Sequence, residues 1–171
     1  MASSLTKGLA VGAALFGGLL AGVTLNRTLV QMPAWEHIGV LPWAHFTRAE
    51  NAGLGRIFYP AIGLIALLLT AGTAIAFRSD RIVRLDRTNS RSQGVPIYAA
   101  AMLAAAYASV TRAVLVPAMF RLRAAGDDVI ELQRIFLIIA RWDGINDILH
   151  VLTFGLSLWG LFAILSRPTS S

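Results

Sequence analysis

The chain of 171 residues contains no cysteine, and only 14% of its residues are charged. The first absence excludes a disulfide scaffold, thiolate metal sites and cysteine catalysis. The second sets the chain apart from soluble domains, of which roughly 25% of residues are charged. Because 56% of the residues are hydrophobic, the composition also excludes a disordered chain. What remains is a single small domain that lies in a membrane.

Lysine is nearly absent as well, so the net charge of +6 comes from fourteen arginines and Lys7. Five of the arginines fall in the short stretch 78–94, between two apolar segments. Positive charge of this kind marks the cytoplasmic loops of membrane proteins. No recognition motif for DNA or RNA accompanies it. The excess of basic residues therefore indicates how the protein is oriented in the membrane, and no nucleic-acid partner is expected.

Four apolar stretches are long enough to cross a bilayer, which takes roughly 20 residues. They cover residues 8–30, 54–77, 95–120 and 135–165. Because they are continuously apolar and far longer than barrel strands, helices are expected. Glycine in the first stretch and alanine in the third would let helices pack closely. The sequence predicts an all-α membrane protein, an antiparallel four-helix transmembrane bundle that forms one domain over residues 1–171.

The distribution of charge predicts the orientation of the bundle. The connection after the third stretch balances its arginines with acids, whereas the stretch 78–94 does not. That stretch is therefore predicted on the cytoplasmic side, and with four spans both termini lie there too. The connection 31–53 contains Trp35 and Trp43, and tryptophan prefers the headgroup level. We expect this Trp-rich connection to cap the outer surface, with a helix from about residue 43 to 51.

Ionisable residues inside a span are costly and mark candidate sites. In the fourth stretch, four polar side chains fall on one stripe at 100° per residue. They are Asp143, Asn146, Asp147 and His150. Polar groups on the other three stretches are expected at a similar depth, among them Arg27, Arg56, Tyr107 and Arg112. The sequence thus predicts a polar pocket in the outer half of the bundle, the kind of place where ligands bind.

Two other interpretations fit these residues. The acids could simply pair with arginines and hold the bundle together, because paired charges are tolerated in membranes. Asp147 and His150 also have the spacing of one half of a di-iron site. The other stretches supply no second half, so no metal and no cofactor are predicted. Two acids, one histidine and several arginines in one zone favour the pocket slightly over structural pairing alone.

Several segments resemble a known family. They are A-G-V-T-L at 21–25, V-Q-M-P-A-W at 30–35, V-P-A-M-F-R-L-R at 116–123 and R-W-D-G-I-N-D at 141–147. With them, nearly the whole chain resembles the small four-span bacterial and fungal membrane proteins grouped with the anthrone oxygenases, many of unknown function. The resemblance implies a cofactor-independent oxidation of a lipophilic, polycyclic, anthrone-like ketone by dioxygen. We expect the protein in a bacterial plasma membrane.

The chemistry implied by this resemblance suggests a role for each polar residue. Asp147 or His150 would remove an acidic proton from the substrate, since a general base must lie near its proton. Asp143 would orient that base. Arg112 or Arg56 would stabilise the enolate oxygen that forms. Hydrogen bonds or ring stacking to the substrate are expected from Asn146, Tyr107, Arg27, Trp142, Trp35 and Trp43.

Three functions stay open at this point, and each predicts a different bundle. An oxygenase needs a roomy pocket that Asp147 and His150 face. A non-enzymatic accessory or assembly subunit of a larger membrane complex needs only acids locked in arginine pairs, without a cavity. A lipid or small-molecule transporter needs a polar route to the inner side, against which the apolar inner halves argue. The expected partners are the lipid bilayer, a lipophilic aromatic small molecule, and either a second copy or a larger membrane complex.

Overall fold

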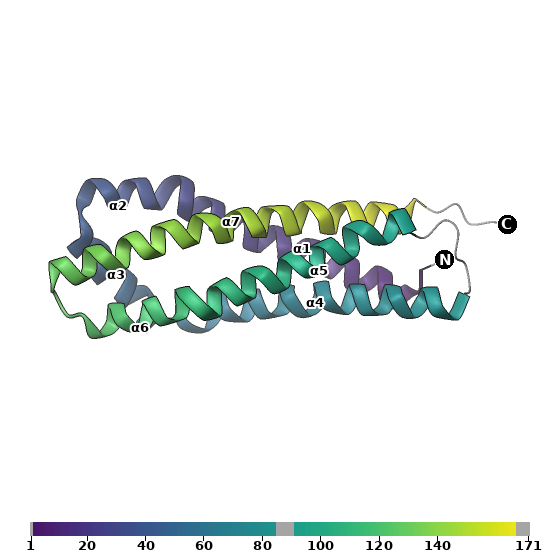
Figure 1. The fold of residues 1–171 in the computed structure, drawn as a ribbon, viewed down its shortest axis with the longest axis horizontal. Coiled ribbons are helices and arrows are strands. Elements are labelled where there is room, and N and C mark those ends of the chain that lie inside the picture. The colour runs from purple at the N-terminus through teal and green to yellow at the C-terminus, as the bar shows by residue number, and fades with distance from the viewer. Residues whose placement is uncertain (1, 85–90, 167–171) are drawn as a thin grey trace.

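The computed structural model describes residues 2–84 and 91–166, and helices account for nearly all of them. Within that part of the chain no strand occurs. Four helical columns lie side by side (Figure 1), and each is long and apolar enough to cross a membrane. The predicted all-α membrane bundle is therefore confirmed.

Two of the columns are single helices and two are interrupted. The second and fourth columns are α4 (Gly55–Arg84) and α7 (Val129–Leu165). The first column consists of α1 (Ser4–Asn26), a π-helical turn η1 (Arg27–Gln31) and α2 (Met32–Ile38). The third consists of α5 (Arg91–Val110), a second π-helical turn η2 (Thr111–Leu115) and α6 (Val116–Ala124).

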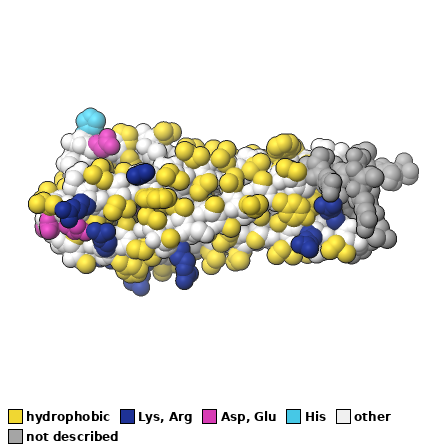
Figure 2. Space-filling view, in the orientation of Figure 1, with side chains coloured by type: hydrophobic (Ala, Val, Ile, Leu, Met, Phe, Trp, Pro, Cys, Tyr) yellow, Lys and Arg dark blue, Asp and Glu magenta, His cyan; other side chains and the backbone are white. Residues whose placement is uncertain are grey.

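The two ends of the bundle differ. α1 begins and α7 ends at one end, here called the terminal end (Figure 1). At the opposite cap end, α2 is followed by α3 (Val40–Ala52), which folds back between the columns. Residues 85–90 of the arginine-rich stretch lie outside the described residues, so the side of the membrane on which each end lies stays a prediction. Figure 2 shows that the acidic side chains visible on one face gather at the cap end.

Both π-helical turns precede a proline. Met32 and Val116 donate their N–H groups to the carbonyls five residues back, those of Arg27 and Thr111. The next residue in each column is Pro33 or Pro117, which has no N–H to donate and whose ring crowds the preceding turn. The segments R-T-L-V-Q-M-P-A at 27–34 and T-R-A-V-L-V-P-A at 111–118 each place an adjacent arginine and threonine five and six residues before a proline, in opposite order. Hydrophobic periodicity alone does not reveal this short similarity.

At the cap end the helical columns extend beyond three of the predicted spans. The first column continues to Ile38 and not to residue 30, the third continues to Ala124, and the fourth begins at Val129 and not at 135. The connection 31–53, expected as a partly helical surface cap, is mostly helix, interrupted at Gly39, where φ is 93°. The columns extend because a separate core supports them there.

The cap core consists of apolar side chains from α2, α3, α6 and α7. Trp43 is only 1% exposed, and its ring meets that of Phe136 edge-on, with the centroids 5.0 Å apart. Arg48 connects the α6–α7 turn to α3 by hydrogen bonds. It donates to the carbonyl of Leu122 at 3.1 Å, to the carboxylate of Asp127 at 3.2 Å, and to the carbonyl of Gly126. Trp43 therefore packs in the cap core, and its ring is not on the surface of the protein.

Small residues let the columns approach closely in the body of the bundle. A Cβ atom added to Gly18 of α1 would lie 2.9 Å from the ring of Phe154 on α7. A Cβ atom added to Gly160 of α7 would lie 2.9 Å from Ile97 on α5. At the terminal end, the carboxylate of Asp80 accepts from the hydroxyl of Thr6 at 2.7 Å, which joins α4 to the start of α1. These contacts fix the register that brings the polar residues together.

Candidate functional site

A cavity of about 1020 Å³ lies in the half of the bundle toward the cap end. Its walls come from α1, η1, α4, α5, η2, the start of α6 and α7, and Glu50 of α3 contributes from the cap side. Ligand pockets range from roughly 300 to 1,000 Å³, so the space is sufficient for a fused-ring compound. Much of the wall is apolar, with residues such as Leu64, Leu67 and Leu115.

The predicted polar stripe of α7 faces this cavity. Asp143, Asn146, Asp147 and His150 all line it, and each is buried. Their spacing of three, one and three residues keeps them on one face of a helix that runs unbroken through the site. The structure therefore brings together all four residues of the stripe.

The two π-helical turns hold this stripe from either side. From η1, Arg27 forms an ion pair with Asp143 at 3.0 Å, and the hydroxyl of Thr28 donates to the carboxylate of Asp147. From η2, the hydroxyl of Thr111 accepts a hydrogen bond from the side-chain amide of Asn146 at 3.2 Å. π-Helical turns occur frequently at functional sites, and here both supply the partners of the buried acids and amide.

Two polar atoms of the stripe lack a partner. Oδ1 of Asn146 and Nδ1 of His150 are buried and form no hydrogen bond within the described part of the chain. Oδ2 of Asp143 also forms none, although it lies in the ion pair with Arg27, whose geometry is not that of a hydrogen bond. A buried polar atom without a partner costs roughly 1–3 kcal/mol. A ligand hydroxyl that reached these atoms could donate to Oδ1 of Asn146 or to an unprotonated Nδ1 of His150.

Aromatic and basic side chains complete the cavity wall. The ring of Tyr107 lies against that of His150, with the centroids 4.3 Å apart at an angle of 42°. The Tyr107 hydroxyl makes a long hydrogen bond of 3.4 Å to the carbonyl of Gly63. Arg112 lines the cavity, is exposed, and has no ion pair or hydrogen bond with any described residue. Since a guanidinium stays charged in proteins, it is a free cation at the rim of the cavity.

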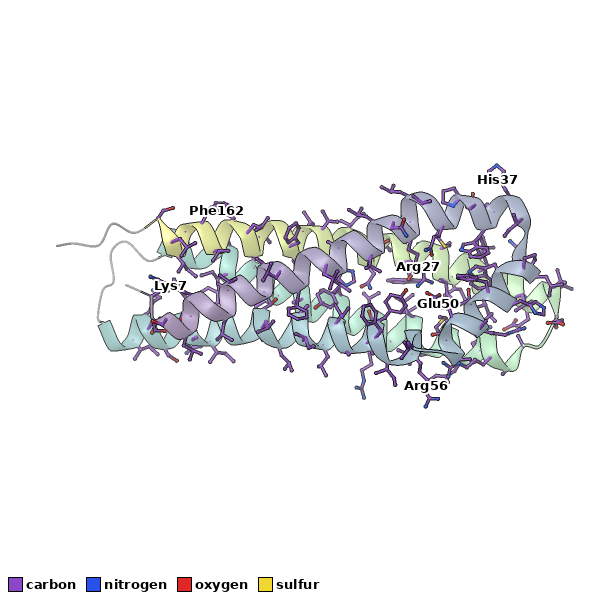
Figure 3. The ribbon with its side chains drawn as sticks, turned by 180° about the vertical axis from the view of Figure 1, so that it is seen from behind. Lys7, Arg27, His37, Glu50, Arg56 and Phe162 are labelled. Atoms are coloured by element: carbon purple, nitrogen blue, oxygen red, sulfur yellow. The ribbon has the colours of Figure 1, made fainter. Side chains whose placement is uncertain are left out.

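Four of the predicted contact residues do not line the cavity. Trp43 is enclosed in the cap core, and the ring of Trp35 lies against that of Phe46, with the centroids 4.9 Å apart at an angle of 44°. Trp142 is half-buried on α7 but lies about 100° around the helix from Asp143. Arg56 is exposed and points away from the bundle (Figure 3). The structure therefore does not bring these four side chains to the cavity, and the helical connection of α2 and α3 holds Trp35 and Trp43 in the cap.

Two residues of the site were missing from the predicted set, Thr28 beside the polar stripe and Glu50 in the cavity wall. Thr28 binds Asp147, and the hydroxyl of Tyr59 donates to the carboxylate of Glu50 at 2.9 Å, which joins α4 to α3 beside the cavity. In Figure 3, Glu50 and Arg27 lie inside the outline of the bundle, in contrast to Arg56. The adjacent arginine and threonine before each proline were a signal that could have identified Thr28. Nothing in the sequence singled out Glu50.

The half of the bundle toward the terminal end is less apolar than predicted. The hydroxyl-bearing side chains of Thr70, Thr73, Thr153 and Ser157 are buried there. Each donates to a carbonyl of its own helix four residues back. The space between Thr70, Thr73 and Ser157 measures only about 10 Å³, room for about one water molecule. The described residues therefore form no wide polar route from the cavity to the terminal end.

Among the described residues, no three His, Cys, Asp or Glu side chains gather in a way that could hold a metal ion. Asp147 and His150, which have the spacing of half a di-iron site, therefore have no further candidate metal ligands among the described residues. No protein-family model, no curated protein and no solved structure matches the sequence or fold of the chain. Apart from the resemblance of its sequence segments, the functional interpretation therefore rests on the cavity and its residues.

Proposed function

We propose that the protein binds a lipophilic, polycyclic aromatic ketone or phenol in the cavity and oxidises it with dioxygen, without a cofactor. The observation that supports this proposal is a cavity of about 1020 Å³ with mostly apolar walls, one side of which is formed by the polar stripe of α7. In that stripe, one polar atom each of Asn146 and His150 has no hydrogen-bond partner among the described residues. The apolar walls suit a fused-ring body, and the stripe suits its oxygen atoms. The oxidation itself is proposed from the family resemblance of the sequence.

The residues suit a base-initiated oxidation. An anthrone-like substrate has an acidic CH₂ group beside its aromatic rings. A general base takes one of its protons, and the resulting enolate transfers an electron to dioxygen. Carbon–oxygen bond formation gives a hydroperoxide. Its oxygen–oxygen bond then breaks as the second proton leaves the carbon. One oxygen atom remains as the new carbonyl and the other leaves as water, so one dioxygen is consumed for each quinone formed.

His150 is the better placed of the two candidate bases. Its Nδ1 has no hydrogen-bond partner among the described residues, whereas Asp147 already accepts from Thr28. Asp147 would hold the stripe and the substrate hydroxyl in position. Arg112 would stabilise the enolate oxygen, since a free cation favours developing negative charge.

The same geometry argues against a purely structural role for the stripe. If the protein were an accessory subunit, its buried acids would be paired with arginines and no cavity would be expected. Of the two acids in the stripe, only Asp143 has such a pair within the described residues, while Asp147 accepts a hydrogen bond from Thr28. Packing alone does not explain a large cavity beside two unpartnered buried polar atoms, because burial without a partner destabilises the fold.

The test is oxidation of 1,8-dihydroxyanthrone by the protein in lipid nanodiscs. We expect one dioxygen consumed per quinone formed, above the spontaneous rate in empty nanodiscs and unaffected by a chelator. His150→Gln should lower the rate at least about 100-fold, because removal of a general base costs roughly 10²–10⁴ in rate. His37→Gln is the matched control, since His37 is exposed in the cap. Binding without oxidation would limit the function to that of a binding protein, and absence of binding would favour the accessory subunit.

A further inference from the structure

The wall of the cavity is incomplete between α4 and the third column. Leu64 of α4 and Val116 of α6 both line the cavity, yet they are 56% and 42% exposed. α4 packs extensively on α1 and also on α5, but it does not pack appreciably on η2 or α6 among the described residues. Pro60, which also lines the cavity, removes one backbone hydrogen bond from α4 at this level. The cavity therefore has a mouth on the side of the bundle, bordered by Leu64 and Val116.

Charged residues along two columns indicate where the membrane boundary passes. Lys7 and Arg27 of the first column are about 20 residues apart, or ~30 Å at 1.5 Å per residue. Arg56 and Arg78 of α4 are about 22 residues apart, or ~33 Å. Both separations match the hydrocarbon thickness of roughly 30 Å. The boundary on the cap side therefore lies near Arg27 and Arg56.

Exposed arginines on the other two columns lie near the same level. Arg112 is one residue after Thr111, which binds Asn146 of α7, and Arg141 precedes Asn146 by about 1.4 helical turns. Long basic side chains at such a level extend their charge to the headgroups while their stems stay in the apolar region. Leu64 lies ~12 Å from Arg56 toward the terminal end, and thus in hydrocarbon. The mouth therefore extends from the headgroup boundary near Arg112 into the hydrocarbon region at Leu64.

We infer that the cavity is filled sideways from the membrane, through the mouth bordered by Leu64 and Val116, by an amphiphile with an acidic or carbonyl oxygen at its polar end. This inference rests on the proposed function, and it adds the route of the ligand and the residue that meets it. An amphiphile at rest in the leaflet has its oxygen atoms at the level of Arg112 and its apolar body at the level of Leu64. Arg112, free of any described partner, contacts the polar end as the molecule enters.

The absence of cysteine makes the route testable with single cysteines. Leu64→Cys places a thiol at the mouth. The matched control is Leu68→Cys, one turn further along α4, at a residue that is 61% exposed and does not line the cavity. Each variant is reconstituted in liposomes and labelled with a bulky aromatic methanethiosulfonate, which a reductant removes again. The initial rate at which 1,8-dihydroxyanthrone binds is followed without oxygen by the quenching of tryptophan fluorescence.

We expect the label at residue 64 to slow binding by about tenfold or more, because association rates vary over decades when access is restricted. The label at residue 68 should change the rate less than about twofold, and reduction should restore the rate at residue 64. Should Leu64→Cys fold poorly before labelling, Val116→Cys with Phe120→Cys as its control makes the same comparison across the mouth.

Each other outcome contradicts the inference. Unchanged binding with residue 64 labelled, or equal slowing at residues 64 and 68, would show that the ligand does not pass this mouth, while the proposed function would stand. No binding to the unlabelled protein would refute the proposed function, and the route with it.

Discussion

The ion pair between Arg27 and Asp143 should respond unequally to the loss of either partner. Their side chains approach to 3.0 Å, with 35% of the arginine and 10% of the aspartate exposed. At this distance the attraction is ~5 kcal/mol for an effective dielectric constant of about 20, before screening of the partly exposed guanidinium. If Asp143 is removed, Arg27 can turn toward water or headgroups. If Arg27 is removed, Asp143 is left as a buried carboxylate without a counter-charge.

We therefore expect Arg27→Met to lower the free energy of unfolding by about 3–5 kcal/mol, the cost of breaking a buried pair. Asp143→Asn should cost only about 1 kcal/mol, the scale of a pair with one partner near solvent. The double variant should resemble Asp143→Asn, because no charge is left buried. The coupling energy from this double-mutant cycle is then several kcal/mol. The effects of independent substitutions on the free energy of unfolding usually add to within ~0.5 kcal/mol.

The assay is unfolding in mixed micelles by titration with sodium dodecyl sulfate, followed by circular dichroism under conditions where refolding is complete. Additive effects of the two substitutions, or a larger cost for Asp143→Asn than for Arg27→Met, would refute the reasoning. Either result would mean that Asp143 does not depend on Arg27 in the folded bundle.

Two further predictions follow from the contacts between and beside the columns. Gly160→Val should destabilise the bundle by about 1–3 kcal/mol through overpacking against Ile97, whereas Gly155→Val, with open space around it, should cost under about 1 kcal/mol in the same unfolding assay. Arg112→Gln should weaken the binding of 1,8-dihydroxyanthrone about tenfold or more, the scale of a hydrogen bond to a charged group. It should leave the binding of oxygen-free anthracene unchanged, and equal losses for both compounds, or an equal effect of Arg141→Gln, would contradict the role of Arg112.

The polar stripe could be predicted because it depends on one helix alone. Periodicity fixes which side chains of α7 share a face, whatever the rest of the bundle does. The partner of each acid depends instead on the register between columns. Gly18 against Phe154 and Gly160 against Ile97 help to set that register, and such contacts cannot be calculated from spacing along the chain. For this reason Arg27, Arg56 and Arg112 were equal candidates to pair with Asp143 until the structure placed Arg27 beside it.

The cap was harder to predict for a different reason. A search for apolar stretches of the length of a bilayer ends where polar residues begin, so it ended the first span near residue 30. The helices continue because Trp43 and the apolar residues around it form a second core at the cap end. Tryptophan in a connection suggested the headgroup level, and only the fold of α3 shows that its ring is enclosed. The π-helical turns were missed because their hydrogen-bond pattern has no counterpart in hydrophobic periodicity.

The central claim, that the cavity holds a lipophilic aromatic ligand, is tested most directly by filling it. Gly63 lines the cavity and Gly155 does not, and both have open space where a side chain would begin. We would measure 1,8-dihydroxyanthrone bound to each purified variant by native mass spectrometry without oxygen. The account predicts one bound molecule on the unmodified protein and on Gly155→Phe, and none on Gly63→Phe. Equal binding by both variants would contradict it.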